Sequence, residues 1–216
     1  MTKKIFWENP YLIELDTVVK KVNGNQITVN ETIFYAFSGG QESDSGTIGG
    51  YTVLNAQKNG KELYYTLDDQ HQLKAGDKVR IIVDWSRRYQ LMRLHFAAEI
   101  ILELVYKKFP TILKTGAHIA EAKARIDFKY EDSISSSLKE LQAHAQSIID
   151  SSQPIISAFS DEVTERRYWK IKEFSPVPCG GTHPQNTKEV GTITLKRINL
   201  GKGKERLEIF IKEKEK

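Results

Sequence analysis

Two short segments of the sequence, HFAAE and CGGTH, each carry two side chains of the kinds that bind metal ions in proteins. His95 and Glu99 stand four positions apart in an apolar run of helical character, so both project from one face of the predicted helix. Cys179 and His183 flank Gly-Gly-Thr, a tight turn that can bring a thiolate and an imidazole back to one point. Nitrogen, oxygen and sulfur donors together suit Zn²⁺ better than Mg²⁺ or Ca²⁺.

The alternative is that these residues occur at these spacings by chance and bind no metal. A single His or Cys is more often a packed or surface residue than a ligand. Cys179 is the only cysteine, however, and two of the five histidines stand at these spacings. His-x3-Glu is a weaker metal pattern than His-x3-His. It is the combination, rather than any one residue, that favours a zinc site made of both pairs.

The composition is that of a soluble globular protein that works in a reducing compartment. The 216 residues are 39% hydrophobic and 28% charged, and a chain of this length buries one large core or two modest ones. No apolar run reaches the roughly 20 residues of a membrane span, and one cysteine cannot form an internal disulfide. We therefore expect a cytoplasmic protein that makes no contact with a membrane.

The net charge of +4 is concentrated at the C-terminal end of the chain. Residues 188–216 contain nine Lys and Arg against five Glu, which accounts for the whole excess. Such a segment can meet a polyanion such as RNA. It can equally be a solvated hairpin followed by a frayed KEKEK end, so the charge permits RNA binding without establishing it.

The first 85 residues show the pattern of an all-β domain. Asn23-Gly24 is a favoured type I′ hairpin pair between two strand-like segments, and Gly-rich turns separate the others. Short strands at regular spacing predict a small closed β-barrel over residues 1–85. The strand-like segments are 17–22, 26–29, 51–56, 62–67 and 78–84.

After Trp85 the pattern becomes that of an α+β domain, residues 86–216, in which helices cover one face of an antiparallel sheet. Ser86 can N-cap a long helix that runs from about residue 87 to 109 and stops at Pro110. The apolar stripe of this helix places His95 and Glu99 beside the core. A second helix is predicted at 136–149, and strands at 124–130, 155–159, 168–172, 190–197 and 206–211.

Several separated motifs of this chain resemble those of the alanyl-tRNA editing (AlaX) proteins, which are free-standing relatives of the editing domain of alanyl-tRNA synthetase. The resemblance spans nearly the full length and includes both halves, as in the two-domain form of the family. The motifs, in order, are ENPYL, TIFYAFSGGQESDSGTIGG, VDWSRRYQLMRLHFAAEI, ARIDF and VPCGGTHPQNTKEVG.

The resemblance implies a β-barrel joined to an editing domain that hydrolyses mischarged aminoacyl-tRNA at a zinc site. The usual substrate of such proteins is seryl-tRNA(Ala), and glycine is another wrong amino acid that they remove. The zinc ligands of the family are His-x3-His and Cys-x3-His. His95, Cys179 and His183 match this pattern, whereas Glu99 replaces the second histidine.

The replacement leaves three roles open for Glu99. As a carboxylate it can ligate Zn²⁺, or it can stay off the metal and act as a general base. It can also mark a lost activity, which would make the chain an RNA-binding module with a decayed metal site. A deacylase for a different aminoacyl ester is a further alternative.

Two more sets of residues are candidates for substrate binding. Gly39-Gly40-Gln41 allows close backbone approach and offers an amide to a serine hydroxyl or a ribose, although a purely structural β-turn has the same sequence. Basic side chains near the start of the long helix can contact tRNA phosphates or can simply be solvated. These candidates for tRNA binding are Arg87, Arg88 and Arg93.

Overall fold

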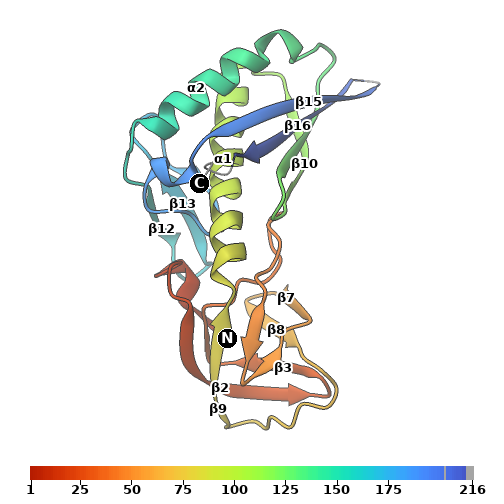
Figure 1. Cartoon of the computed structure of the whole chain (residues 1–216), viewed down its shortest axis with the longest axis vertical. Coiled ribbons are helices and arrows are strands. Elements are labelled where there is room, and N and C mark those ends of the chain that lie inside the picture. The colour runs from red at the N-terminus through yellow and green to blue at the C-terminus, as the bar shows by residue number, and fades with distance from the viewer. Residues whose placement is uncertain (202, 213–216) are drawn as a thin grey trace. The chain divides into compact units, whose positions relative to one another are not determined.

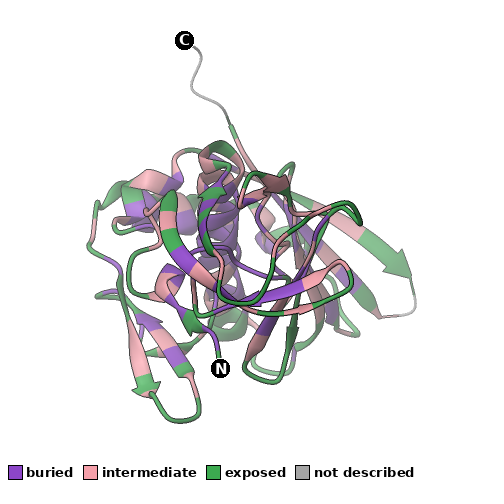
Figure 2. Ribbon diagram, turned by 90° about the horizontal axis from the view of Figure 1, so that it is seen from below, coloured by how far each residue is buried: buried purple, intermediate pink, exposed green. Residues whose placement is uncertain are grey.

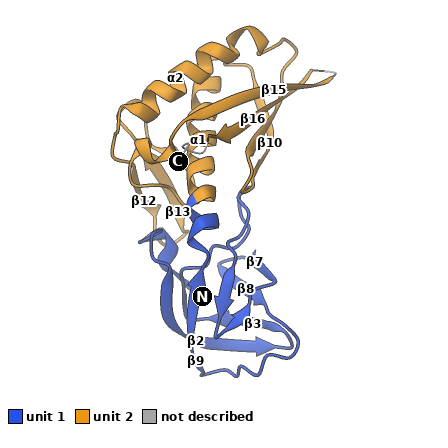
Figure 3. Ribbon diagram, viewed as in Figure 1, with its two compact units in different colours: residues 1–89 blue, residues 90–216 orange. Residues whose placement is uncertain are grey.

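The computed structural model describes residues 1–201 and 203–212 and divides into two compact units, 1–89 and 90–216 (Figures 1 and 3). The fold is mixed α/β with mainly antiparallel sheets and few helices, in agreement with the α+β prediction. Lys202 and residues 213–216, the last four of the KEKEK end, lie outside the described residues, and with them part of the predicted basic segment.

The first unit is built on a curved seven-stranded sheet with the strand order β6-β5-β9-β2-β3-β8-β7. Residues 1–89 are all described, and within them no ladder joins β6 to β7, so the sheet forms a half-barrel. Closure into a small barrel therefore stays a prediction. The strands are β1 (Lys3–Lys4), β2 (Glu14–Asn23), β3 (Gln26–Val29), β4 (Glu31–Thr32), β5 (Gly46–Ile48), β6 (Tyr51–Thr52), β7 (Asn55–Asn59), β8 (Glu62–Thr66) and β9 (Lys78–Val83), with one 3₁₀ turn at Ile5–Trp7.

The predicted hairpin of β2 and β3 forms, but its turn lies one residue later than expected. Asn23 pairs with Gln26, so the two turn residues are Gly24 and Asn25. Gly24 has a φ of +58°, whereas Asn25 is not among the residues with positive φ. Glycine at the first central position is the pattern of a type II′ turn rather than the predicted type I′.

A buried ion pair organises the core of the first unit. Arg88 is fully buried, and its Nε donates to Oδ1 of Asp44 at 2.8 Å. Its Nη1 donates to the carbonyl of Pro10 at 2.9 Å, and its Nη2 donates to Asp44 and to the carbonyl of Ile33. Four hydrogen bonds to protein groups thus hold the buried guanidinium, which gives Arg88 a structural role in place of the predicted phosphate contact.

Helix α1 (Trp85–Lys108) is the long helix that the sequence predicts, and the division between the units falls within it, after Tyr89. Its N-cap is Asp84 rather than Ser86, because the Asp84 carboxylate accepts the backbone N–H of Arg87 at 3.3 Å. The helix is buried on most of its faces in the second unit, well beyond one stripe (Figure 2). Among the described residues, no helix combines the length and apolar character needed to cross a membrane.

Two antiparallel sheets complete the second unit, with the orders β10-β11-β16-β15 and β12-β13-β14. Helix α2 (Leu138–Asp150) lies along the edge strand β15, whose backbone N–H groups at Ile193 and Leu195 donate to Gln146 and Gln142. The two glutamine side chains thus accept hydrogen bonds from backbone N–H groups at the edge of the sheet, where no neighbouring strand pairs with them. The strands are β10 (Leu113–Ile119), β11 (Ala124–Lys129), β12 (Ile156–Asp161), β13 (Arg166–Lys170), β14 (Val177–Pro178), β15 (Ile193–Gly201) and β16 (Lys204–Ile211), with 3₁₀ turns at Ser135–Ser137 and Thr187–Val190.

Removal of one partner of the buried pair is expected to destabilise the protein strongly. Arg88→Leu leaves the Asp44 carboxylate buried without its counter-charge, so we expect a loss of about 3–5 kcal/mol in the free energy of unfolding. Urea denaturation followed by circular dichroism measures it. The matched control is Arg80→Leu, which breaks the exposed pair of Arg80 with Asp16 and should have a much smaller effect. Equal losses in the two variants would contradict the structural role of Arg88.

Candidate metal centre

The two predicted pairs of ligands come from elements that are adjacent in the second unit. His95 and Glu99 lie on α1, and the CGGTH segment begins directly after β14. The backbone N–H of Cys179 donates to the carbonyl of Arg167 at 2.9 Å, which fixes the start of this segment beside β13. Long-range packing thus brings together residues that are 84 positions apart, as the 3.1 Å contact between His95 and Cys179 illustrates.

His95, Cys179 and His183 form a cluster whose ligand atoms all lie within 4.8 Å of one another. Sγ of Cys179 is 3.1 Å from Nε2 of His95 and 3.4 Å from Nε2 of His183. Zinc bonds at tetrahedral angles place a nitrogen and a sulfur ligand about 3.6 Å apart. Both sulfur–nitrogen distances are therefore within about 0.5 Å of the value expected around a bound zinc ion.

The two nitrogens of the His95 ring have different surroundings. Nε2 faces Cys179, whereas Nδ1 is buried and has no hydrogen-bond partner among the described residues. The backbone of Gly181 lies against the same ring, since a Cβ at this position would be 2.3 Å from Cε1 of His95 and 2.6 Å from Nε2. Only glycine allows the turn to approach the imidazole this closely.

The shifts in pKa indicate that His95, Cys179 and His183 are all uncharged when no cation is present. Burial lowers the pKa of His95 to about 4, and nearby Lys114 adds to this effect. Burial, then the neighbouring His95 and Arg167, lower the pKa of His183 well below its usual value. Burial raises the pKa of the Cys179 thiol, and the Glu99 carboxylate raises it further. Both imidazoles thus present lone pairs, and a cation would favour the thiolate of Cys179.

Glu99 lies beside the cluster and is not one of its three members. Its Oε1 is 3.8 Å from Nε2 of His95, and its Oε2 accepts the indole N–H of Trp169 at 3.0 Å. Burial raises the pKa of the carboxyl group, partly offset by the Trp169 hydrogen bond and by Lys114. Of the four predicted ligands, three therefore form the cluster in this structure, and Glu99 lies next to His95 without being part of it.

Two residues that sequence reasoning missed support the cluster. Oγ of Ser157 on β12 is 3.0 Å from Nδ1 of His183, which orients that ring with Nε2 toward Cys179. Trp169 on β13 holds Glu99, as described above. Neither residue is separated from a candidate ligand by a number of positions typical of a motif. Only the pairing of β12 with β13 and their packing near α1 could show that they contact the cluster.

The Gly39-Gly40-Gln41 segment forms a tight turn in the first unit. The backbone N–H of Gln41 donates to the carbonyl of Ser38 at 3.0 Å, and the N–H of Ser38 donates back at 3.2 Å. Gly39 and Gly40 have φ values of +61° and +88°, which the turn requires and which glycine adopts without strain. The Gln41 side chain is buried. The turn geometry explains the two glycines, and a contact of Gln41 with substrate stays a prediction.

The other two predicted arginines are partly exposed but already hydrogen-bonded to protein groups. Nη2 of Arg87 donates to Glu42 at 2.7 Å, within the first unit. Nε of Arg93 donates to the carbonyl of Val190 at 3.1 Å, within the second unit. Phosphate contacts at Arg87 and Arg93 therefore stay predictions.

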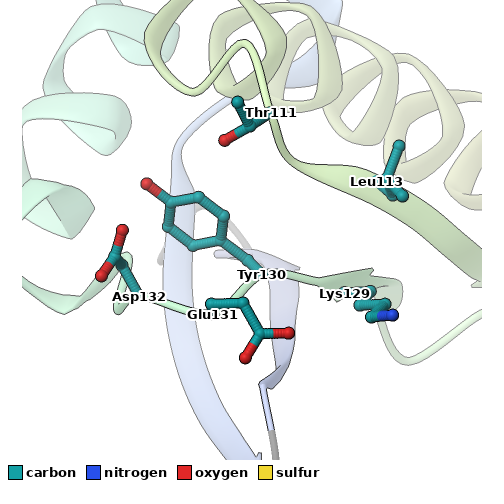
Figure 4. A pocket seen from close by; sticks show the side chains of 6 residues that line it. All are labelled: Thr111, Leu113, Lys129, Tyr130, Glu131 and Asp132. Atoms are coloured by element: carbon teal, nitrogen blue, oxygen red, sulfur yellow. The ribbon is translucent and has the colours of Figure 1, made fainter.

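A small surface pocket elsewhere in the second unit shares no residue with the cluster (Figure 4). It encloses about 180 Å³, and most of the residues that line it are exposed. Its lining carries no combination of donors comparable to the cluster. The residues are Thr111, Leu113, Lys129, Tyr130, Glu131 and Asp132.

Two family models match parts of the chain. Residues 9–87 match the family described as tRNA synthetases class II (A). Residues 167–208 match the threonyl and alanyl tRNA synthetase second additional domain. The second match includes Cys179 and His183 of the cluster.

Full-length similarity to known proteins is substantial. The chain is 31% identical over 215 residues to the alanyl-tRNA editing protein AlaX-M of Pyrococcus horikoshii, and covers 98% of each sequence. It is 30% identical to AlaX-M of Saccharolobus solfataricus, with 98% of this chain and all of that protein covered. It is 32% identical to alanine–tRNA ligase of Methanococcus maripaludis, where 96% of this chain matches 26% of the ligase.

The close approach of Gly181 to His95 predicts a large difference between two adjacent glycines. Gly181→Ala is expected to push the His95 ring out of place and to weaken Zn²⁺ binding by about 10–100-fold, as misoriented ligands do. Gly180→Ala is the control, because a Cβ there meets nothing within 4 Å. Competition titration of Zn²⁺ against a chromogenic chelator measures both affinities. Equal affinities for the two variants would show that the cluster does not hold the metal through His95.

Proposed function

Because the chain belongs to the AlaX-M family of alanyl-tRNA editing proteins, we propose that it acts in trans on mischarged tRNA(Ala) and hydrolyses the aminoacyl ester. Seryl-tRNA(Ala) is the substrate that we propose first, and glycyl-tRNA(Ala) the second. The observation that carries the proposal is the His95–Cys179–His183 cluster, which joins the donors of two distant segments at one point.

The three residues of the cluster are proposed to hold a zinc ion. Two imidazoles and a thiolate are common zinc ligands, and three protein ligands leave one coordination position open, as in catalytic zinc sites. A bound zinc ion would supply polarisation of the ester carbonyl between the amino acid and the ribose. His95, Cys179 and His183 then serve to fix the position at which the carbonyl is presented.

Glu99 is proposed as the general base for the attacking water. One of its oxygens, Oε2, is held by Trp169, while Oε1 lies on the side of His95. Burial raises the pKa of the carboxyl group, which makes its ionised form a better proton acceptor. In this role Oε1 takes the proton that water releases as its oxygen attacks the ester carbonyl. The protonated Glu99 then gives this proton to the ribose oxygen as the ester bond breaks, so that the amino acid leaves with the water oxygen and the tRNA hydroxyl is restored.

Recognition of tRNA is proposed to involve both parts of the chain. We propose that residues 1–85 form a β-barrel domain and that residues 86–216 form the editing domain. The protein is proposed to work in the cytoplasm. Backbone groups of the Gly39-Gly40 turn and the Gln41 amide are proposed to face the substrate. Arg87 and Arg93 are proposed to contact phosphates of the tRNA.

The activity can be tested directly. Zinc-loaded protein is expected to release serine from seryl-tRNA(Ala) and to leave alanyl-tRNA(Ala) intact, with a rate that falls as salt screens the phosphate contacts. Release of radiolabelled amino acid at several KCl concentrations measures it. His183→Ala should abolish the activity, whereas His144→Ala, an exposed histidine on α2, should not alter it.

Other outcomes would identify the alternatives. Zinc-loaded protein that binds tRNA(Ala) but cleaves neither the seryl nor the glycyl ester would support a binding module with a decayed site. Release of only some other amino acid would retain the hydrolase and replace the substrate.

The role of Glu99 as base predicts a separation between metal binding and rate. Glu99→Gln keeps the size of the side chain but cannot accept the proton, so we expect Zn²⁺ content to be unchanged and the rate to fall by about 10²-fold or more. Glu99→His, which restores the histidine expected from the family, should also keep the metal and lose rate. Zinc content and single-turnover deacylation of the variants are the measurements. A rate in Glu99→His equal to or above that of the wild type would instead make position 99 a ligand.

A further inference from the structure

Among the described residues, the polar contact of the Trp169 side chain is with Glu99. The indole N–H donates to Oε2 of Glu99 at 3.0 Å, across 70 positions of sequence. Trp169 is fully buried on β13. An indole has a single N–H and no acceptor, so the hydrogen bond to Glu99 uses its entire polar capacity.

The Trp169 ring is held in place by aromatic packing. It meets Phe96 edge to face with 5.0 Å between ring centroids, and Phe174 with 5.8 Å. Phe96 follows His95 on α1 and also packs against the His183 ring at 5.7 Å. Phe96 thus contacts both the indole of Trp169 and the His183 ring of the cluster.

This contact determines where the carboxylate of Glu99 lies. With Oε2 tied to Trp169, Oε1 rests 3.8 Å from Nε2 of His95, and Glu99 stays outside the group of three ligands. A carboxylate so close to a ligand atom would otherwise compete for a metal ion, because zinc binds carboxylate oxygen at about 2.0–2.2 Å.

We propose that Trp169 is a positioning residue that holds Glu99 beside the metal cluster and off the metal, which keeps one coordination position open for the substrate. Only the predicted effect of Trp169 on the deacylation rate rests on the proposed function. Its structural consequence concerns the ligand set of the ion and can be observed in protein that holds Co²⁺ and no tRNA.

Co²⁺ spectroscopy tests the proposal through the number of ligands. The Co²⁺-loaded protein should give the same visible spectrum in the wild type and in Glu99→Gln, because Glu99 is not a ligand. In Trp169→Phe the released carboxylate should bind the ion and change the intensity and position of the d–d bands. The double variant Trp169→Phe/Glu99→Gln should return to the wild-type spectrum. Trp85→Phe, a tryptophan of the first unit that stacks on Tyr89, is the control and should change nothing.

The results that overturn the proposal are equally definite. A spectrum that changes in Glu99→Gln alone would show that Glu99 is already a ligand. A wild-type spectrum in Trp169→Phe would show that the tryptophan only fills space. The deacylation rate is the second measurement. Trp169→Phe should lower kcat by about 10–100-fold with little change in KM, as is typical when a residue that orients the groups around a metal site is replaced.

A third measurement covers the case in which Trp169→Phe does not fold. The indole N–H of Trp169 in Glu99→Leu, which lacks an acceptor, should exchange with solvent at least tenfold faster than in the wild type, whereas the indole N–H of Trp85 should not change. Unchanged exchange at Trp169 would overturn the proposal. A wild-type protein without deacylase activity would refute the proposed function, while the spectra and the exchange rates would still decide the role of Trp169.

Discussion

The architecture of the cluster depends on a single steric constraint, the contact between the His95 ring and the backbone of Gly181. A Cβ at position 181 would lie 2.3 Å from Cε1 of the ring, far inside van der Waals contact. Because glycine removes that atom, the turn after β14 can lie directly against α1. Sγ of Cys179 then reaches 3.1 Å from Nε2 of His95, and His183 completes the group. A larger residue at position 181 would force the turn and the His95 ring apart.

Burial gives this close arrangement its chemical character. Desolvation lowers the pKa of His95 and His183 and raises that of the Cys179 thiol, so the donors face one another uncharged. A group of neutral donors with few protein partners is a favourable environment for a cation, which supplies the charge that the thiolate requires. The low dielectric of the site also strengthens each electrostatic interaction within it.

The main features of the fold could be predicted from local pattern, whereas several details could not. Alternation and turn residues located the β2–β3 hairpin, and helical periodicity located α1. The turn residues were predicted one position early, because Asn23-Gly24 and Gly24-Asn25 are both good turn pairs and the register of the strands decides between them. The cap of α1 is Asp84 rather than Ser86 for a similar reason, since both residues are good caps and hydrogen bonds with distant Ser45 hold Asp84 in place.

The sequence by itself determined the two pairs of candidate ligands, since the i, i+4 spacing of His95 and Glu99 and the glycine turn after Cys179 are local geometry. Tertiary structure alone decided which of these side chains form the cluster. Glu99 is held by a tryptophan 70 positions away, and Arg88 is buried against Asp44 although its sequence context resembles that of an exposed arginine. The physical reason is that spacing along a helix fixes the direction of a side chain. The partner that it meets depends on strands and loops brought in from distant parts of the chain.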